Sequence, residues 1–323
     1  MSENILEVKH LKTYFPVKEG VIKKTVGYVR AVEDVSFNVK KKQVFALVGE
    51  SGCGKSTTGL SIVRLINPTS GQVLFEGEDL SKLSDEEMRL KRRDMQFIFQ
   101  NPYASLNPRM NVYELLAEPL KTHFKLSQEE LDKRILSMMD KIGMTEDQLW
   151  RYPHQFSGGQ KQRISIARAL ITKPRFVVAD EPVSALDVSI QAQVINLLIA
   201  LQKEMQLSMI FISHDLNVVR FISHELAVMY LGSIMETGNT KLIYERPMHP
   251  YSRALLDAVP KLDPAAKHKR RHLKGEVPNP VNPPKGCPFN TRCEKAKDIC
   301  FKEKPKLLEY KDRLVACHYP LED

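Results

Sequence analysis

Short apolar runs alternate with stretches of helical periodicity over most of the chain, from Ile5 to about Val259. Runs rich in apolar β-forming residues are typical of strands buried on both faces. Their alternation with helical stretches predicts an α/β fold, with a mainly parallel sheet covered by helices. The predicted strands are Val44–Val48, Gln96–Phe99, Phe176–Ala179 and Met209–Ile212.

The span from Val112 to Trp150 has a different pattern, because apolar residues recur there at helical spacing with charged residues between them. This pattern predicts a helical subdomain, at about residues 101–172, inserted into the sheet domain. The recurring apolar positions are Leu115, Leu116, Leu120, Leu131, Ile135, Met138, Met139 and Ile142.

The texture changes again after Pro260. Prolines crowd the stretch Glu276–Gly286, which predicts a stiff extended linker rather than a packed element. We therefore expect a large domain over residues 1–259 and a small C-terminal extension over residues 260–323.

Composition limits the classes of function. The 323 residues are 42% hydrophobic, and no apolar stretch approaches the length of a membrane-spanning helix. The N-terminus carries charges where a signal peptide needs an apolar core, so we expect a cytosolic chain. The net charge of +9 suits polyphosphate, nucleic acid or an anionic membrane surface. The basic cluster at Lys267, Lys269, Arg270, Arg271 and Lys274 has no interleaved aromatic residues, which favours a solvated linker and no nucleic-acid partner.

A phosphate-binding loop of the pattern G-x-x-x-x-G-K-[ST] occupies residues 49–56. It follows the predicted strand Val44–Val48 and precedes a predicted helix, Lys55–Ile66. In such a loop, backbone N–H groups and the helix N-terminus surround the phosphates of ATP. Lys55 is expected to reach the β- and γ-phosphates, and Ser56 to bind Mg²⁺. The loop residues are Gly49, Glu50, Ser51, Gly52, Cys53, Gly54, Lys55, Ser56 and Thr57, and the buried side of the helix is predicted at Leu60, Val63 and Ile66.

Polar residues follow three other predicted strands. Asp180 and Glu181 end a buried run, an arrangement that places one carboxylate on Mg²⁺ and the next beside the attacking water. Gln100 can reach metal and water together, and His214 can contact the γ-phosphate. These residues predict nucleotide hydrolysis rather than binding alone.

The segment Phe156-Ser157-Gly158-Gly159-Gln160 resembles the signature motif of the ATP-binding subunits of ABC transporters. That family's motifs occur here in its own order: the phosphate loop, Gln100, the signature, Asp180-Glu181, Ser184-Ala185-Leu186-Asp187 and His214. The resemblance covers about the first 250 residues. It implies a P-loop ABC-type core with a parallel sheet, an antiparallel β subdomain and an inserted helical subdomain.

The resemblance also implies roles for individual residues. Glu181 would be the general base, with His214 and Gln100 completing the catalytic set, and Ser56, Gln100 and Asp180 would hold Mg²⁺. The signature would cap ATP bound to a second subunit, so that two chains close around two nucleotides. Residues implied at that dimer contact are Ser157, Gly158, Gly159 and Gln160, with Ser184 and Asp187 in the dimer loop; adenine would stack on Phe15 or Tyr14.

The segment His249-Pro250-Tyr251 is similar to the start of the C-terminal extension in oligopeptide and dipeptide importer ATPases. This likeness implies peptide uptake, a position on the cytoplasmic face of the membrane, and several partners. The partners are a second ATPase subunit, identical or a paralogue, two transmembrane permease subunits and an extracellular peptide-binding protein. Nickel uptake is a related alternative, and a soluble ABC-type ATPase acting on nucleic acid or ribosomes is another.

Four of the five cysteines lie behind the proline-rich stretch, at Cys287, Cys293, Cys300 and Cys317. Clustered thiols in a cytosolic protein indicate a tetrahedral metal site, although their spacing is wider than in zinc ribbons. Softness alone does not separate Zn²⁺ from an iron–sulfur cluster. The segment Cys287–Cys293 resembles that of peptide-importer ATPases with a [4Fe-4S] cluster, which implies a cluster that staples the tail and leaves open a redox-sensing role. The alternative is four unligated buried thiols, and Cys53 is interpreted as a small filler.

Overall fold

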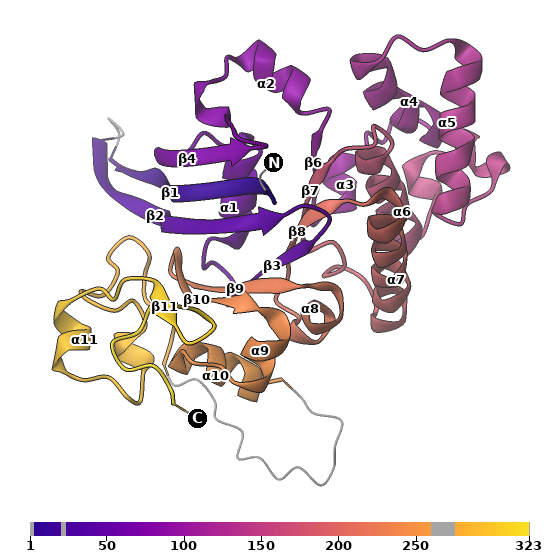
Figure 1. Cartoon of the computed structure of the whole chain (residues 1–323). Coiled ribbons are helices and arrows are strands. Elements are labelled where there is room, and N and C mark those ends of the chain that lie inside the picture. Colours follow the sequence, from indigo (N-terminus) through magenta and orange to yellow (C-terminus); the bar gives the residue numbers. More distant parts are fainter. Residues whose placement is uncertain (1–2, 21–23, 260–274, 323) are drawn as a thin grey trace, which may run out of the picture. The chain divides into compact units, whose positions relative to one another are not determined.

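A computed structural model describes residues 3–20, 24–259 and 275–322 (Figure 1). The chain forms two compact units, each assembled from separate segments. The first unit contains Met1–Ile5, Val39–Gln43 and Asp79–Ile212, and the second contains Leu6–Asn38, Val44–Glu78 and Ser213–Asp323. The basic cluster at Lys267, Lys269, Arg270, Arg271 and Lys274 and the predicted domain boundary near residue 260 lie outside the described residues.

The first unit is built on three parallel strands in the order β6-β7-β8, namely Met95–Ile98, Phe176–Asp180 and Ser208–Ile212. Both β7 and β8 are buried along their whole length, as the apolar runs predicted. Against β6 packs helix α6 (Gly158–Leu170), which also contacts helix α7 (Val188–Met205).

The helical part of this unit follows its apolar periodicity. Helices α4 (Val112–His123) and α5 (Gln128–Lys141) pack together, and every apolar position predicted from the spacing is buried. Each helix begins with a reciprocal side-chain cap, at Asn111 for α4 and at Ser127 for α5. The shorter elements of the first unit are η1 (Leu80–Lys82), α2 (Asp85–Lys91), α3 (Pro102–Ser105), η2 (Glu146–Trp150) and η3 (Pro153–Gln155).

The second unit contains five strands in the order β11-β12-β10-β9-β3. Strands β3 (Val44–Val48) and β9 (Glu225–Tyr230) pair in parallel, whereas β10 (Ser233–Asn239), β12 (Arg313–Val315) and β11 (Leu308–Tyr310) extend the sheet with antiparallel pairs. The tail therefore adds strands to this sheet. The helices are α1 (Lys55–Ile62), α8 (Leu216–Ile222), α9 (Thr240–Glu245), α10 (Pro250–Asp257), η4 (Asn290–Arg292) and α11 (Asp298–Lys302).

A separate four-stranded sheet has the order β2-β1-β4-β5. Its long strands β1 (Asn4–Glu19) and β2 (Lys24–Lys40) lie mostly in the second unit, and β4 (Ser70–Phe75) pairs with β1 in an antiparallel register. The short strand β5 (Glu78–Asp79) ends it. An antiparallel β region therefore accompanies the parallel strands, as the family resemblance implied.

The helix after the phosphate loop differs from the prediction. It ends at Ile62 rather than Ile66, and Arg64 turns into the left-handed region at φ 50°. Its buried side includes Thr58 and Ser61, whose hydroxyls bond to Gly54 O and Thr13 Oγ1 at 2.9 and 2.8 Å. Apolar periodicity missed this face because paired hydroxyls bury well. Of the predicted buried positions Val63 is buried, while Leu60 and Ile66 are half-buried.

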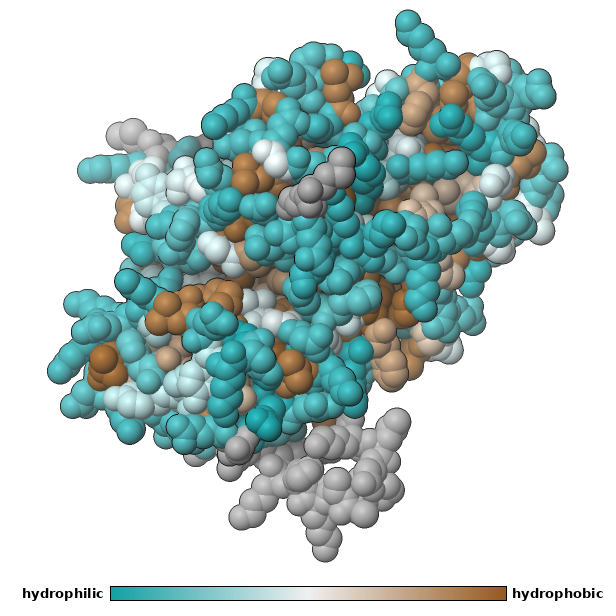
Figure 2. All heavy atoms as spheres, viewed as in Figure 1, coloured by the Kyte–Doolittle hydropathy of each residue, from teal (hydrophilic) through white to brown (hydrophobic). Residues whose placement is uncertain are grey.

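The surface in Figure 2 is mainly hydrophilic, and its hydrophobic residues form small separated groups. Within residues 3–20, 24–259 and 275–322, no helix has the length and apolar character needed to cross a membrane.

Candidate functional site

The phosphate loop connects β3 to α1 and needs glycine at two close approaches. Gly49 and Gly54 have φ of 151° and 101°. A Cβ atom would lie 2.2 Å from Met229 O at the first position and 2.0 Å from Ala31 O at the second. Only glycine fits there, so the backbone can curl as phosphate binding requires.

Lys55 lies in the middle of this loop and is buried. Its ammonium donates hydrogen bonds to the carbonyl oxygens of Gly49 and Glu50 at 2.9 and 3.0 Å. Burial raises the pKa of the neighbouring Cys53 thiol, which agrees with its interpretation as a small filler. Ser56 and Thr57 are half-buried in the first turn of α1.

The two candidates for adenine stacking lie side by side in β1 but differ in environment. The Tyr14 hydroxyl donates to Glu33 Oε2 at 2.7 Å, and burial together with Glu33 raises the pKa of Tyr14 to about 12. Phe15 has no polar group to satisfy and is 38% exposed. The more open ring favours Phe15 as the stacking residue.

The structure brings three of the predicted residues of the first unit together. Gln100 Nε2 donates to Glu181 Oε2 at 3.0 Å and to Ser184 Oγ at 3.3 Å. Asp180, the buried last residue of β7, directly precedes Glu181. Glu181 itself has a left-handed φ of 42°, and its N–H donates to Ile212 O at 2.9 Å. A carboxylate held by an amide donor can orient and deprotonate a water molecule.

His214 belongs to the second unit and is exposed. The preceding residue, Ser213, donates its N–H to Leu47 O at 3.3 Å, which ties this stretch to the strand that leads into the phosphate loop. His214 is therefore anchored beside β3.

The signature segment forms the N-terminus of α6. The Ser157 hydroxyl accepts from the N–H of Gln160, and the Gln160 side chain accepts from the N–H of Ser157, which closes a reciprocal cap. A Cβ at Gly159 would lie 2.4 Å from Ile190 Cγ2 on α7, whereas Gly158 has room. Ser157 and Asp187, the residue before α7, are both exposed. The positive helix end is therefore open to an anion.

The four tail cysteines gather around one cavity of about 20 Å³. Burial raises the pKa of Cys287 to about 12 and that of Cys317 to about 11. In the part of the chain that the structure describes, no three His, Cys, Asp or Glu side chains form a ready metal-binding group. In general chemistry, four thiolates are donors that soft metals and iron–sulfur clusters accept. Asn290 also lines the cavity, and its buried Oδ1 has no hydrogen-bond partner among residues 3–20, 24–259 and 275–322.

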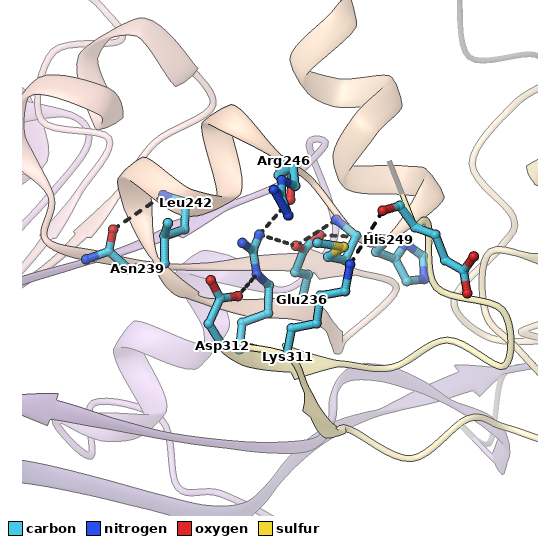
Figure 3. A network of polar contacts seen from close by, with 10 residues as sticks. Glu236, Asn239, Leu242, Arg246, His249, Lys311 and Asp312 are labelled. Atoms are coloured by element: carbon cyan, nitrogen blue, oxygen red, sulfur yellow. Dashed lines mark hydrogen bonds and ion pairs between the residues drawn. The ribbon is translucent and has the colours of Figure 1, made fainter.

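A buried carboxylate, Glu236, joins the C-terminal segment to the sheet (Figure 3). It accepts hydrogen bonds from the N–H groups of Met248 and His249, both at 2.9 Å, and from Arg313 Nη1 at 3.1 Å. Burial lowers the pKa of His249 to about 3. The neutral ring caps α10 by accepting from the N–H of Tyr251 at 3.0 Å.

Sequence reasoning missed one contact of the phosphate loop. Arg292, the residue before Cys293, forms an ion pair with Glu50 in which Nη1 lies 2.6 Å from Oε2 and Nη2 3.1 Å from Oε1. The two residues are 242 positions apart. The only available signal was a lone acidic residue inside a loop that binds anions.

Comparisons with known proteins agree with these features. The family model "ABC transporter" matches residues 32–184, and the model "Oligopeptide/dipeptide transporter, C-terminal region" matches residues 235–300. The chain is 50% identical to the oligopeptide transport ATP-binding protein AppF of Bacillus subtilis (strain 168), over 98% of this chain and 97% of that protein. It is 47% identical to the dipeptide transport ATP-binding protein DppF of Escherichia coli (strain K12), over 98% and 95% respectively.

A solved structure is also similar. It is the dimeric, post-hydrolysis state of the ATP-binding cassette MJ0796 bound to ADP and Pi. The TM-score is 0.65 at 30% identity, and the match covers 73% of this chain and 98% of that one.

Proposed function

Since the chain belongs to the ABC transporter family, in its oligopeptide and dipeptide branch, we propose that it is the ATPase that powers the uptake of oligopeptides or dipeptides. The observation that carries the ATPase assignment is the cluster of Gln100, Glu181 and Ser184. A carboxylate oriented by an amide is the equipment of hydrolysis rather than of nucleotide storage.

Each residue of the site has a proposed role. Lys55 would neutralise charge on the β- and γ-phosphates of ATP, and Ser56, Gln100 and Asp180 would hold the Mg²⁺ that offsets the remaining phosphate charge. Glu181 accepts a proton from the attacking water, and its bond to Gln100 sets the carboxylate plane. His214 contacts the γ-phosphate.

The signature supplies the second half of a nucleotide site on another subunit. The exposed, capped N-terminus of α6 offers the N–H groups of Gly158 and Gly159 to the γ-phosphate of a partner's ATP. Ser184 and Asp187 belong to the same contact. ATP thus joins two cassettes, and hydrolysis releases them.

The proposed membrane partners are two transmembrane permease subunits, served outside by a peptide-binding protein, and the chain acts at the cytoplasmic face. A surface groove of about 440 Å³ runs along α4 and offers a place for a permease helix. The residues that line it are Met110, Tyr113, Glu114, Ala117, Glu118, Lys121 and Thr122.

Reconstitution tests this function. The chain is purified from membranes with whatever co-purifies, inserted into liposomes, and assayed for ATP-dependent uptake of labelled dipeptides and longer peptides, with nickel as the alternative substrate. We expect permease subunits and peptide uptake. Nickel uptake without peptide uptake, or a free chain whose ATPase is stimulated by DNA or ribosomes, would contradict the proposal.

The proposed resident of the cysteine cavity is a [4Fe-4S] cluster held by Cys287, Cys293, Cys300 and Cys317, with Zn²⁺ as the alternative. Binding requires these thiols to lose their protons, and it would staple a tail that has little core of its own. Anaerobic purification followed by iron and acid-labile sulfide analysis tests it. Zinc without sulfide, or no metal, contradicts the cluster.

A further inference from the structure

Glu50 is held from three directions inside the phosphate loop. Its N–H donates to the Tyr251 hydroxyl at 3.0 Å, and its carbonyl accepts from Lys55 Nζ at 3.0 Å. Its carboxylate receives both Nη atoms of Arg292. Two of these three contacts, those of Tyr251 and Arg292, come from the C-terminal part of the chain. That part therefore contacts the loop at Glu50.

Arg292 is built into its position. Its side chain is 5% exposed, and its Nη1 also donates to the Tyr230 hydroxyl at 3.3 Å. Its pKa is raised chiefly by the hydrogen bonds that it donates to the Glu50 carboxylate, so the guanidinium stays charged. The fork geometry fixes both carboxylate oxygens at once, which a single ammonium cannot do.

An aromatic cluster packs around the residues that hold Glu50. The rings of Tyr230, Tyr251 and Phe289 lie with centroids 4.7 to 5.3 Å apart. Tyr251 and Phe289 are fully buried, and Phe289 immediately precedes η4, which carries Arg292. The cluster therefore holds the Arg292 guanidinium and the Tyr251 hydroxyl in position at Glu50.

The charge on Glu50 poses an electrostatic problem. A carboxylate within a loop that receives a polyphosphate repels that ligand, and the Glu50 side chain is only 25% exposed, so water screens the repulsion in part. Arg292 neutralises the charge of Glu50 and holds its carboxylate in one orientation. The tail has a second anchor in the pair Arg313–Glu236, whose partners among the described residues include Met248, His249 and Arg246.

We propose that Arg292 is a positioning residue for nucleotide binding: by neutralising and fixing Glu50 it makes the C-terminal segment set the affinity of the phosphate loop for ATP. This rests on the proposed function, because it takes residues 49–56 as the ATP site. It assigns the segment around the cysteines a role in the reaction besides closing the fold.

The test measures the Kd for MgATP by calorimetry on the full chain, together with the melting temperature of each variant. Arg292→Met is expected to raise the Kd roughly 3- to 30-fold, the range of coupling between neighbouring groups. The double variant Arg292→Met/Glu50→Gln removes the unpaired charge and is expected to return the Kd to within about 3-fold of wild type. Arg313→Met is the matched control, because it breaks a buried ion pair of the same segment without leaving an unpaired charge on the loop: it is expected to lower the melting temperature and to leave the Kd within about 2-fold.

Three results overturn the proposal. They are an unchanged Kd in folded Arg292→Met, an equal rise in Arg313→Met, or no rescue by Glu50→Gln. If Arg292→Met does not fold, Arg292→Gln tests the same charge with an amide in its place, and an unchanged Kd there is equally decisive. Failure of the underlying function would give a different result, namely a Lys55→Ala variant that binds MgATP as well as wild type.

Discussion

The phosphate loop and the signature segment are both helix N-termini suited to phosphate, yet their surroundings differ. The loop is braced by buried side chains, among them Lys55 and Tyr251, and by the Arg292 ion pair. In the described part of the chain, the signature is capped by its own residues, Ser157 and Gln160, and Ser157 is exposed.

The phosphate loop is therefore supported from within the chain, whereas the signature segment is a helix end that faces solvent. The loop already has its partners inside the chain, so its geometry belongs to the folded subunit. At the open end of α6 the cap pairs only the N–H groups of Gln160 and Ser157, and the first turn still presents positive potential to solvent. We infer that nucleotide affinity is a property of one subunit, whereas closure requires a second.

The largest effect is expected from Glu181→Gln, which leaves loop and signature intact. Loss of the general base should slow hydrolysis about 10²- to 10⁴-fold, while MgATP binding persists. The two halves then remain joined, and the protein should run as a dimer with ATP in light-scattering chromatography. Wild-type hydrolysis by this variant would refute the assignment of the base.

Lys55→Ala breaks the loop side of the comparison. Removal of the ammonium costs charge-assisted bonds to phosphate and should weaken MgATP binding roughly 10- to 150-fold. Calorimetry on the isolated subunit measures this loss directly. Unchanged affinity would mean that the loop is not the nucleotide site.

Ser157→Asp breaks the signature side without disturbing the helix, because aspartate is also a good N-cap. Its negative charge should oppose the partner's γ-phosphate and weaken ATP-driven dimerisation at least about 10-fold. Ser157→Asn supplies a neutral cap as the control. With Glu181→Gln as background, chromatography compares the two, and equal dimerisation would contradict the proposed contact.

The smallest effect concerns the packing that aims the signature. Gly159→Ala places a methyl group 2.4 Å from Ile190 Cγ2 and should destabilise the fold by about 1–3 kcal/mol. Gly158→Ala, whose Cβ meets Leu186 at an ordinary 3.4 Å, is the control. Urea denaturation measures both, and equal stabilities would show that α6 and α7 yield to the methyl group without cost.

The sequence predicted elements well where one pattern dominates. Strand β3 has the predicted bounds, and β7 ends at Asp180, one residue beyond the predicted Ala179, with Glu181 directly after it. Gln100 and Glu181 meet because neighbouring parallel strands end at one edge. Local spacing and strand order are sufficient for such features.

Other features depend on partners that local pattern does not reveal. The buried face of α1 includes the hydroxyl residues Thr58 and Ser61, which look polar in the sequence until their hydrogen-bond partners are known. Arg292 looks like an ordinary surface cation beside a cysteine, and its partner Glu50 lies 242 positions away. Long-range ion pairs need the fold before they can be identified.

Strand β12 of the C-terminal extension pairs with β10 of the large predicted domain. The folded sheet therefore crosses the domain boundary that the sequence predicted near residue 260. A break introduced anywhere within residues 260–274 would separate the polypeptide into two pieces. The shorter piece would still contribute β11 and β12 to the sheet, Arg313 to Glu236 and Arg292 to Glu50. Co-expressed as separate fragments, the two pieces should therefore assemble, and the larger alone should be an incomplete ATPase.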